Sequence, residues 1–234
     1  MVGTRVVAAV VALFAAAALL VVLLARFDAF GGSSQPRAAQ ASAQTRDLPP
    51  FRSVELAGSN DVAITVGPRQ SVVVHADRNV IRRVTTRVVG GTLVIGDVPG
   101  GLTSRTPMRV EITMPFVSAL TLTGSGVINA NDMIAMPLKV RLAGSGLIRA
   151  GGSTTHLGVT LSGSGDAQLD GLVARDVDAV LLGSGRILVN ATNRLNASVP
   201  GSGAIVYVGH PAHLTTSVTG SGAVVSAGTE AGLS

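Results

Sequence analysis

Residues 122–150 read LTGSGVINANDMIAMPLKVRLAGSGLIRA and contain two copies of one short unit. The unit is marked by Gly-Ser-Gly, and this triplet recurs along the C-terminal half of the chain. The six triplets begin at Gly124, Gly144, Gly163, Gly183, Gly201 and Gly220, with spacings of 20, 19, 20, 18 and 19 residues. Six triplets at nearly constant spacing indicate a structural repeat.

The residues that flank the triplets form two apolar columns. Two positions before the first glycine stand Leu122, Leu142, Leu161, Leu181, Val199 and Val218. Two positions after the second glycine stand Ile128, Ile148, Ala167, Ile187, Ile205 and Val224. Because side chains alternate faces along a β-strand, both columns point to one side of the chain. That side is the predicted core.

The same alternation assigns directions to the triplet itself. The glycines predicted to face inward are Gly124, Gly126, Gly144, Gly146, Gly163, Gly165, Gly183, Gly185, Gly201, Gly203, Gly220 and Gly222. The serines predicted to face outward are Ser125, Ser145, Ser164, Ser184, Ser202 and Ser221. Since glycine has no Cβ, it lets a sheet bend and lets layers approach closely. Each triplet is therefore predicted to be a bend between two short strands.

Two architectures compete for such a repeat. A hairpin meander needs turn signals every 8–12 residues and does not require one motif to recur at the same parity. A period near 19 with short strands suits one coil of a parallel solenoid, in which neighbouring coils bury their apolar columns against one another. We predict an all-β, parallel β-helix or solenoid-like stack of about six Gly-Ser-Gly coils, spanning residues 116–228.

Residues 51–115 are related to the repeat but differ from it. Val54 to Ile64 copies the unit with Asn60 in place of the second glycine, and is predicted to be a degenerate first coil. Strands are expected over residues 71–75 and 108–114, and around Gly90-Gly91, a two-residue hairpin signal. We expect this region to cap one end of the stack, covering backbone groups that would otherwise invite pairing.

Residues 1–27 are predicted to be a membrane anchor or signal segment. Val6 to Ala25 is an unbroken run of apolar residues flanked by Arg5 and Arg26. A helix of this length spans ~30 Å, the hydrocarbon thickness of a bilayer. We favour an uncleaved anchor; cleavage near Ala43, which would leave a secreted domain, is the alternative. Residues 28–50 are expected to be a flexible linker, with the folded domain over residues 51–228.

Composition narrows the function classes. The chain has no cysteine, which excludes a disulfide scaffold and a cysteine-ligated metal centre. Its net charge is +5, but no run of basic residues stands beside aromatic residues. We therefore expect a solvated surface and no nucleic-acid groove.

Several motifs together resemble a known family. These are the Phe51-x-x-Val-x-Leu opening, the segment Asp61-Val-Ala-Ile64, Met114-Pro115 and the recurrent Gly-Ser-Gly. They are similar to the bacterial head GIN domain, also called domain of unknown function 2807, over about residues 50–228. The resemblance implies a β-helix-like all-β domain on exported or membrane-tethered proteins, often labelled an autotransporter adhesin head. It implies no catalytic residues.

No convergent catalytic or metal-binding set is evident. The closest histidine pair, His210 and His213, has no acidic residue nearby in sequence and is interpreted as two turn residues, so no metal or cofactor is predicted. The serines lack a neighbouring base. The densest acidic group is Asp166, Asp170, Asp176 and Asp178. Asp166 is expected to pair with Arg186 of the next coil, and the others to occupy turns.

The sequence thus favours a non-enzymatic cell-envelope protein: an interaction or adhesion module tethered through Val6–Ala25, with the β domain outside the cytoplasm. The outward serine column is the candidate binding surface for a glycan or an envelope protein. The alternative is a polysaccharide-processing lyase or hydrolase, with Asp166, Asp170 and Arg186 as its candidate residues. A further expectation is self-association through the last coil, residues 218–226, which has no evident cap.

Overall fold

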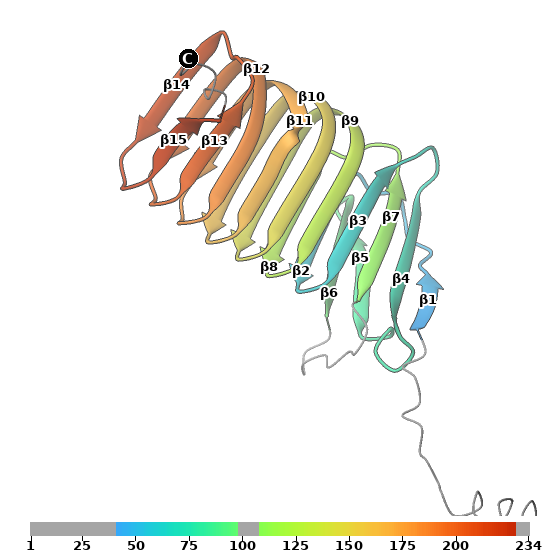
Figure 1. Ribbon diagram of the computed structural model, residues 1–234. Coiled ribbons are helices and arrows are strands. Elements are labelled where there is room, and N and C mark those ends of the chain that lie inside the picture. The colour runs from blue at the N-terminus through green and yellow to red at the C-terminus, as the bar shows by residue number, and fades with distance from the viewer. Residues whose placement is uncertain (1–40, 98–107, 228–234) are drawn as a thin grey trace, which may run out of the picture. The chain divides into compact units, whose positions relative to one another are not determined.

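The computed structural model describes residues 41–97 and 108–227 (Figure 1). Within these residues the structure contains fifteen β-strands and no helix. The described residues belong to one compact unit. All fifteen strands join one continuous sheet that winds around a single apolar core. The predicted all-β solenoid is therefore confirmed.

The C-terminal half forms the stack of coils. Its strands are β8 (Ala119–Gly124), β9 (Val127–Gly144), β10 (Leu147–Gly163), β11 (Asp166–Leu181), β12 (Arg186–Val199), β13 (Ala204–Val208), β14 (His213–Val218) and β15 (Ala223–Ser226). Each pairs in parallel with the strand one coil away. The order is the one expected of a solenoid, because equivalent positions of successive coils lie directly over one another.

The apolar columns lie where the alternation placed them. Leu122, Leu142 and Leu161 are in register across β8, β9 and β10, and all three are buried. The second column, including Ile128 and Ile148, is equally buried. Each coil therefore covers the apolar side chains of its neighbour, and this stacking supplies the core.

The Gly-Ser-Gly triplets stack over one another at the bends where one strand ends and the next begins. A Cβ on Gly144 would overlap the carbonyl oxygen of Gly124, and the same clash recurs up the column to Gly220. Gly124, Gly144 and Gly163 also have φ near +140°, a region L side chains rarely adopt. Both reasons given for glycine in the sequence analysis, the bend and the close approach, are thus present in the structure.

The N-terminal half supplies one more coil and a cap. Its strands are β2 (Ser53–Gly58), β3 (Asp61–Val66), β4 (Ser71–Asp77), β5 (Val84–Val89), β6 (Thr92–Asp97) and β7 (Arg109–Met114). The coil of β2 and β3 lies between β8 and β9 on one side and β6 and β7 on the other. The next layer is antiparallel, with β4 against β7 and β5 against β6.

The predicted hairpin of this cap is confirmed, and a contact that was not predicted joins the cap to the degenerate coil. Gly90 and Gly91 join β5 to β6 with φ of 55° and 75°, as a tight hairpin with positive φ at both central residues requires. Asn60, which replaces the second glycine of the triplet, is buried and donates from Nδ2 to Asp97 Oδ1 at 2.8 Å. The side chain that departs from the repeat thus ties the degenerate coil to the cap.

The predicted linker requires a correction over its last ten residues. β1 (Ala41–Thr45) pairs antiparallel with β4, and the following Arg46 donates from its side chain to the carbonyl oxygens of Ile81 and Val84. The fold therefore begins before Phe51. The predicted span Val6–Ala25 lies outside the described residues, and within the described ones no helix is long and apolar enough to cross a membrane.

Candidate binding surfaces

The predicted serine column is present as a regular row of side chains. Ser125, Ser145, Ser164, Ser184, Ser202 and Ser221 are all exposed. Backbone bonds hold each serine one layer above the last: the amide of Ser145 donates to Gly124, that of Ser164 to Gly144 and that of Ser184 to Gly163. Because coils are spaced by ~4.8 Å, the hydroxyls form a ladder with that repeat.

A shallow groove of about 440 Å³ follows the upper part of the ladder. It is lined by Ser164, Ser184, Ser202 and Ser221, together with Asp166, Arg186 and the small residues between them. Arg186 lies 3.5 Å from Asp166 on the next coil, so the predicted pair between coils forms. The groove thus combines a row of hydroxyls with one carboxylate and one guanidinium on its wall.

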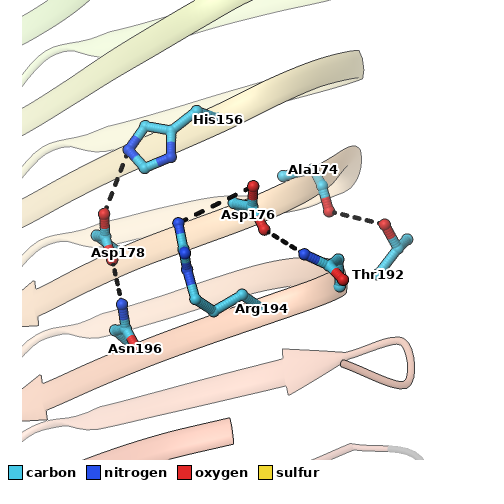
Figure 2. A network of polar contacts seen from close by, with 8 residues as sticks. His156, Ala174, Asp176, Asp178, Thr192, Arg194 and Asn196 are labelled. Atoms are coloured by element: carbon cyan, nitrogen blue, oxygen red, sulfur yellow. Dashed lines mark hydrogen bonds and ion pairs between the residues drawn. The ribbon is translucent and has the colours of Figure 1, made fainter. Parts of the chain in front are cut away.

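Asp176 and Asp178 form a second polar ladder, on another side of the coils. Asp170, Asp176 and Asp178 all lie within β11 and not in turns, which corrects the prediction for the three of them. Asp178 accepts from Asn196 Nδ2 at 2.7 Å and lies 3.2 Å from His156 Nε2, so three successive coils are joined (Figure 2). Asp170 remains exposed.

Asp176 is the centre of the neighbouring contacts in Figure 2. Its carboxylate accepts from Asn193 Nδ2 at 2.7 Å and lies 3.9 Å from the guanidinium of Arg194. The hydrogen bond from Asn193, helped by the charge of Arg194, lowers the pKa of Asp176 below its ordinary value. Because every carboxylate in this ladder has a donor on an adjacent coil, the ladder cross-links coils.

The histidines do not gather into a metal site. His75 lies 3.2 Å from Glu111 and His156 lies 3.2 Å from Asp178. His210 precedes β14 and His213 is its first residue, and both are exposed. Within residues 41–97 and 108–227, no group of three or more histidine or acidic side chains could hold a metal ion.

An apolar cleft at the start of the stack was not anticipated. Ile134, Met136 and Phe116 are 79%, 74% and 59% exposed and line one cleft of about 310 Å³ beside Arg52. A second cleft, of about 590 Å³, shares Arg52 and Phe116. The sequence did contain a signal for this cleft, the apolar run from Met133 to Met136. Because side chains alternate faces along a strand, four consecutive apolar residues cannot all face inward.

Taken together, these features define a class of protein: a β-solenoid with a row of exposed serines along its coils and apolar clefts near its N-terminal end. The family model described as "Putative auto-transporter adhesin, head GIN domain" matches residues 50–211. The chain belongs to this family, domain of unknown function 2807, and the resemblance noted in its sequence is confirmed.

Solved structures support the same fold. A putative adhesin from Bacteroides fragilis aligns with a TM-score of 0.66 at 19% identity, covering 80% of this chain and 97% of the other. A putative lipid binding protein from Parabacteroides distasonis aligns with a TM-score of 0.50 at 21% identity, covering 81% and 97%. At these identities the likeness concerns the fold alone. The curated proteins contain no match to this sequence.

Proposed function

We propose that this protein is a non-enzymatic adhesion module of the bacterial cell envelope, anchored through Val6–Ala25 and displaying its solenoid outside the cytoplasm. The adhesin description of its family supports a binding role. The unbroken apolar run near the N-terminus supports anchoring. A rigid stack of coils, linked layer by layer through backbone hydrogen bonds, suits a protein that holds a surface in fixed geometry.

The ligand of this module is a glycan held along the serine ladder. The observation that carries this assignment is the row of six exposed hydroxyls at a constant layer spacing, with a groove beside four of them. Serine hydroxyls both donate and accept, as sugar hydroxyls do. A repeating polymer can therefore meet a repeating protein surface, and each further coil adds a contact.

Substitution inside the groove tests this assignment. Replacing Ser164, Ser184 and Ser202 by alanine removes three hydroxyls, each worth ~0.5–1.5 kcal/mol when hydrogen-bonded. Binding to the best polysaccharide of a panel, measured by titration calorimetry, should weaken by about tenfold or more. The control, Ser153→Ala with Thr155→Ala, alters exposed hydroxyls of β10 outside the column. Unchanged affinity in the triple variant would refute the assignment.

The enzymatic alternative can be tested with the same panel. A polysaccharide lyase or hydrolase would act through Asp166, Asp170 and Arg186. In the structure Asp166 lies beside Arg186 on an open wall, and Asp170 is exposed. Polysaccharide cleavage needs carboxylates placed on either side of the scissile bond in a confined site. Release of unsaturated or reducing ends that disappears in Asp166→Asn would establish the alternative instead.

The apolar cleft supports a second candidate function, binding of an amphiphile with an anionic head group. Phe116, Ile134 and Met136 offer an apolar wall, and Arg52 lies at the junction of the two clefts. Long-chain fatty acids are the matching probes. Ile134→Asp should abolish displacement of a fluorescent fatty acid, whereas Val173→Asp, at an exposed valine of β11, should leave it intact. Equal displacement by both variants would contradict this candidate.

A further inference from the structure

The last coil of the solenoid is open on one side. Among the strands of residues 41–97 and 108–227, β14 pairs with β12 alone and β15 pairs with β13 alone. In a parallel ladder each strand turns alternate amides and carbonyls toward each neighbour, so half of these groups on β14 face outward, away from β12. Residues 212–221 are all exposed. Among the described residues, β14 is therefore a sheet edge with no strand on its outer side.

The core columns continue into this coil without being covered. Leu214 and Val218 are in register with Leu195 and Val199 of the preceding coil. The inner pair are fully buried at 0% exposed, whereas Leu214 is 47% and Val218 is 44% exposed. The surface shown to solvent at this end is thus the same kind of surface that each inner coil presents to its successor.

The open end lacks the usual protection of sheet edges. Natural edge strands carry charges, prolines or bulges that prevent pairing with another chain. Between Arg194 and Glu230 the sequence contains no aspartate, glutamate, lysine or arginine, and β14 and β15 contain no proline. At the other end of the stack, β6 and β7 cover the coil of β2 and β3, antiparallel strands β5 and β4 follow, and the edge strand β5 carries Arg87.

We infer that the terminal coil binds the terminal coil of a second copy of this chain, end to end, with β14 antiparallel to its own copy. The outward backbone groups of one open coil can pair with those of another open coil. The first Gly-Ser-Gly coil does not offer such groups, because β2 and β3 already pair with its strands β8 and β9. The terminal coil is therefore the uncovered parallel coil that a second copy can offer. Two identical surfaces meeting in this way form a closed two-fold dimer, and their lack of charge leaves no like-charge repulsion.

The inference holds whether or not the serine ladder binds a glycan, since it uses the backbone edge of β14 and not the serine hydroxyls. The regular spacing of the ladder serines nevertheless allows the arrangement of the two copies to be measured. The chain has no native cysteine, so spin labels can be placed singly at Ser221→Cys, Ser184→Cys and Ser145→Cys of the full-length protein. In an end-to-end dimer, the distance along the stack between equivalent labels grows by ~10 Å for each coil moved away from the joint.

The expected result of pulsed electron spin resonance is a short distance at position 221 and progressively longer ones at 184 and 145. Equal distances at the three positions would indicate head-to-tail or side-by-side assembly and would overturn the inference. A concentration-independent monomer in light scattering would also overturn it. A monomer whose β14 amides resist hydrogen exchange would identify residues 228–234 or another segment of the same chain as the cover.

A charge variant supplies the complementary test. Leu214→Lys with Val218→Lys places four positive charges at the joint, on side chains already exposed in the single chain. The midpoint of dimerisation in light scattering should rise by more than about tenfold, because like charges across an interface oppose association strongly. Val173→Lys, at a comparably exposed valine of β11, should leave dimerisation unchanged. Equal dimerisation of both variants would refute the joint.

Discussion

At the scale of single residues, the Gly-Ser-Gly glycines are required for two separate reasons. Gly144 has φ of +139°, and a Cβ there would meet the backbone of Gly124. An alanine therefore introduces both backbone strain and overpacking, each of which costs ~1–3 kcal/mol.

We predict that Gly144→Ala lowers the free energy of unfolding by about 2–5 kcal/mol, measured by urea denaturation. Gly158→Ala is the matched control, because Gly158 lies in β10, the strand that follows the β9 of Gly144, and has open space where its Cβ would stand. Its unfolding free energy should stay the same or rise slightly, since alanine restricts the unfolded chain. Equal losses in both variants would contradict this account of the column.

The pKa of Asp176 gives a second residue-scale prediction. The hydrogen bond from Asn193 lowers this pKa in the folded protein, so its stabilising contribution is present above the ordinary aspartate range. That contribution is lost as the pH falls through the folded value. Carbon-13 NMR titration should show the pKa of Asp176 rise in Asn193→Ala. Asn196→Ala, whose amide bonds Asp178, should leave the pKa of Asp176 where it is. The reverse pattern would argue against this assignment.

At the scale of elements, β1 shows how a segment with no apolar period joins the fold. Ala41 to Thr45 are small and polar, and β1 is held by backbone pairing with β4. Arg46 then fastens the strand, because its guanidinium donates to Ile81 at 3.0 Å and to Val84 at 3.3 Å.

We expect Arg46→Ala to cost ~1.5–3 kcal/mol, the usual range for hydrogen bonds made by a charged group. Hydrogen exchange of β4 should become faster, since its outer neighbour is loosened. Arg82→Ala removes an exposed arginine from the same region and should change neither the unfolding free energy nor the exchange. Unaltered β4 protection in Arg46→Ala would show that backbone pairing alone retains β1.

At the scale of the whole molecule, the two proposals combine into a mode of adhesion. The chain enters the fold at β1, in the cap, and the proposed joint is at the opposite end of the stack (Figure 1). An end-to-end dimer therefore carries its two entry points at opposite ends. If each copy is anchored through its N-terminus, the pair bridges two surfaces.

Bead aggregation tests this bridging. Beads that carry the protein by its N-terminus should aggregate, and those that carry Leu214→Lys with Val218→Lys should not. Attachment through residue 234 places the joint against the bead and should suppress aggregation of the unaltered chain. Aggregation that is indifferent to the charge variant would contradict bridging through the terminal coil.

The repeat, the solenoid and the inward or outward direction of its residues could all be predicted from sequence. Each follows from local rules: the spacing of Gly-Ser-Gly, and the alternation that places Leu142 inward and Ser145 outward. The hairpin at Gly90-Gly91 was predictable for the same reason, since a two-residue turn is specified by its own residues.

The tertiary structure decided what depends on segments far apart in the chain. Backbone pairing joins β1 to β4 without any requirement on side-chain type, so Ala41 to Thr45 carried no signal. The partners of Asp178 lie 22 residues before it and 18 after it, at His156 and Asn196, and only the register of three coils brings them together. The amino-acid sequence alone determined the coil and its repeat. The order of the layers, the cross-linked aspartates and the open terminal edge follow from which strands meet.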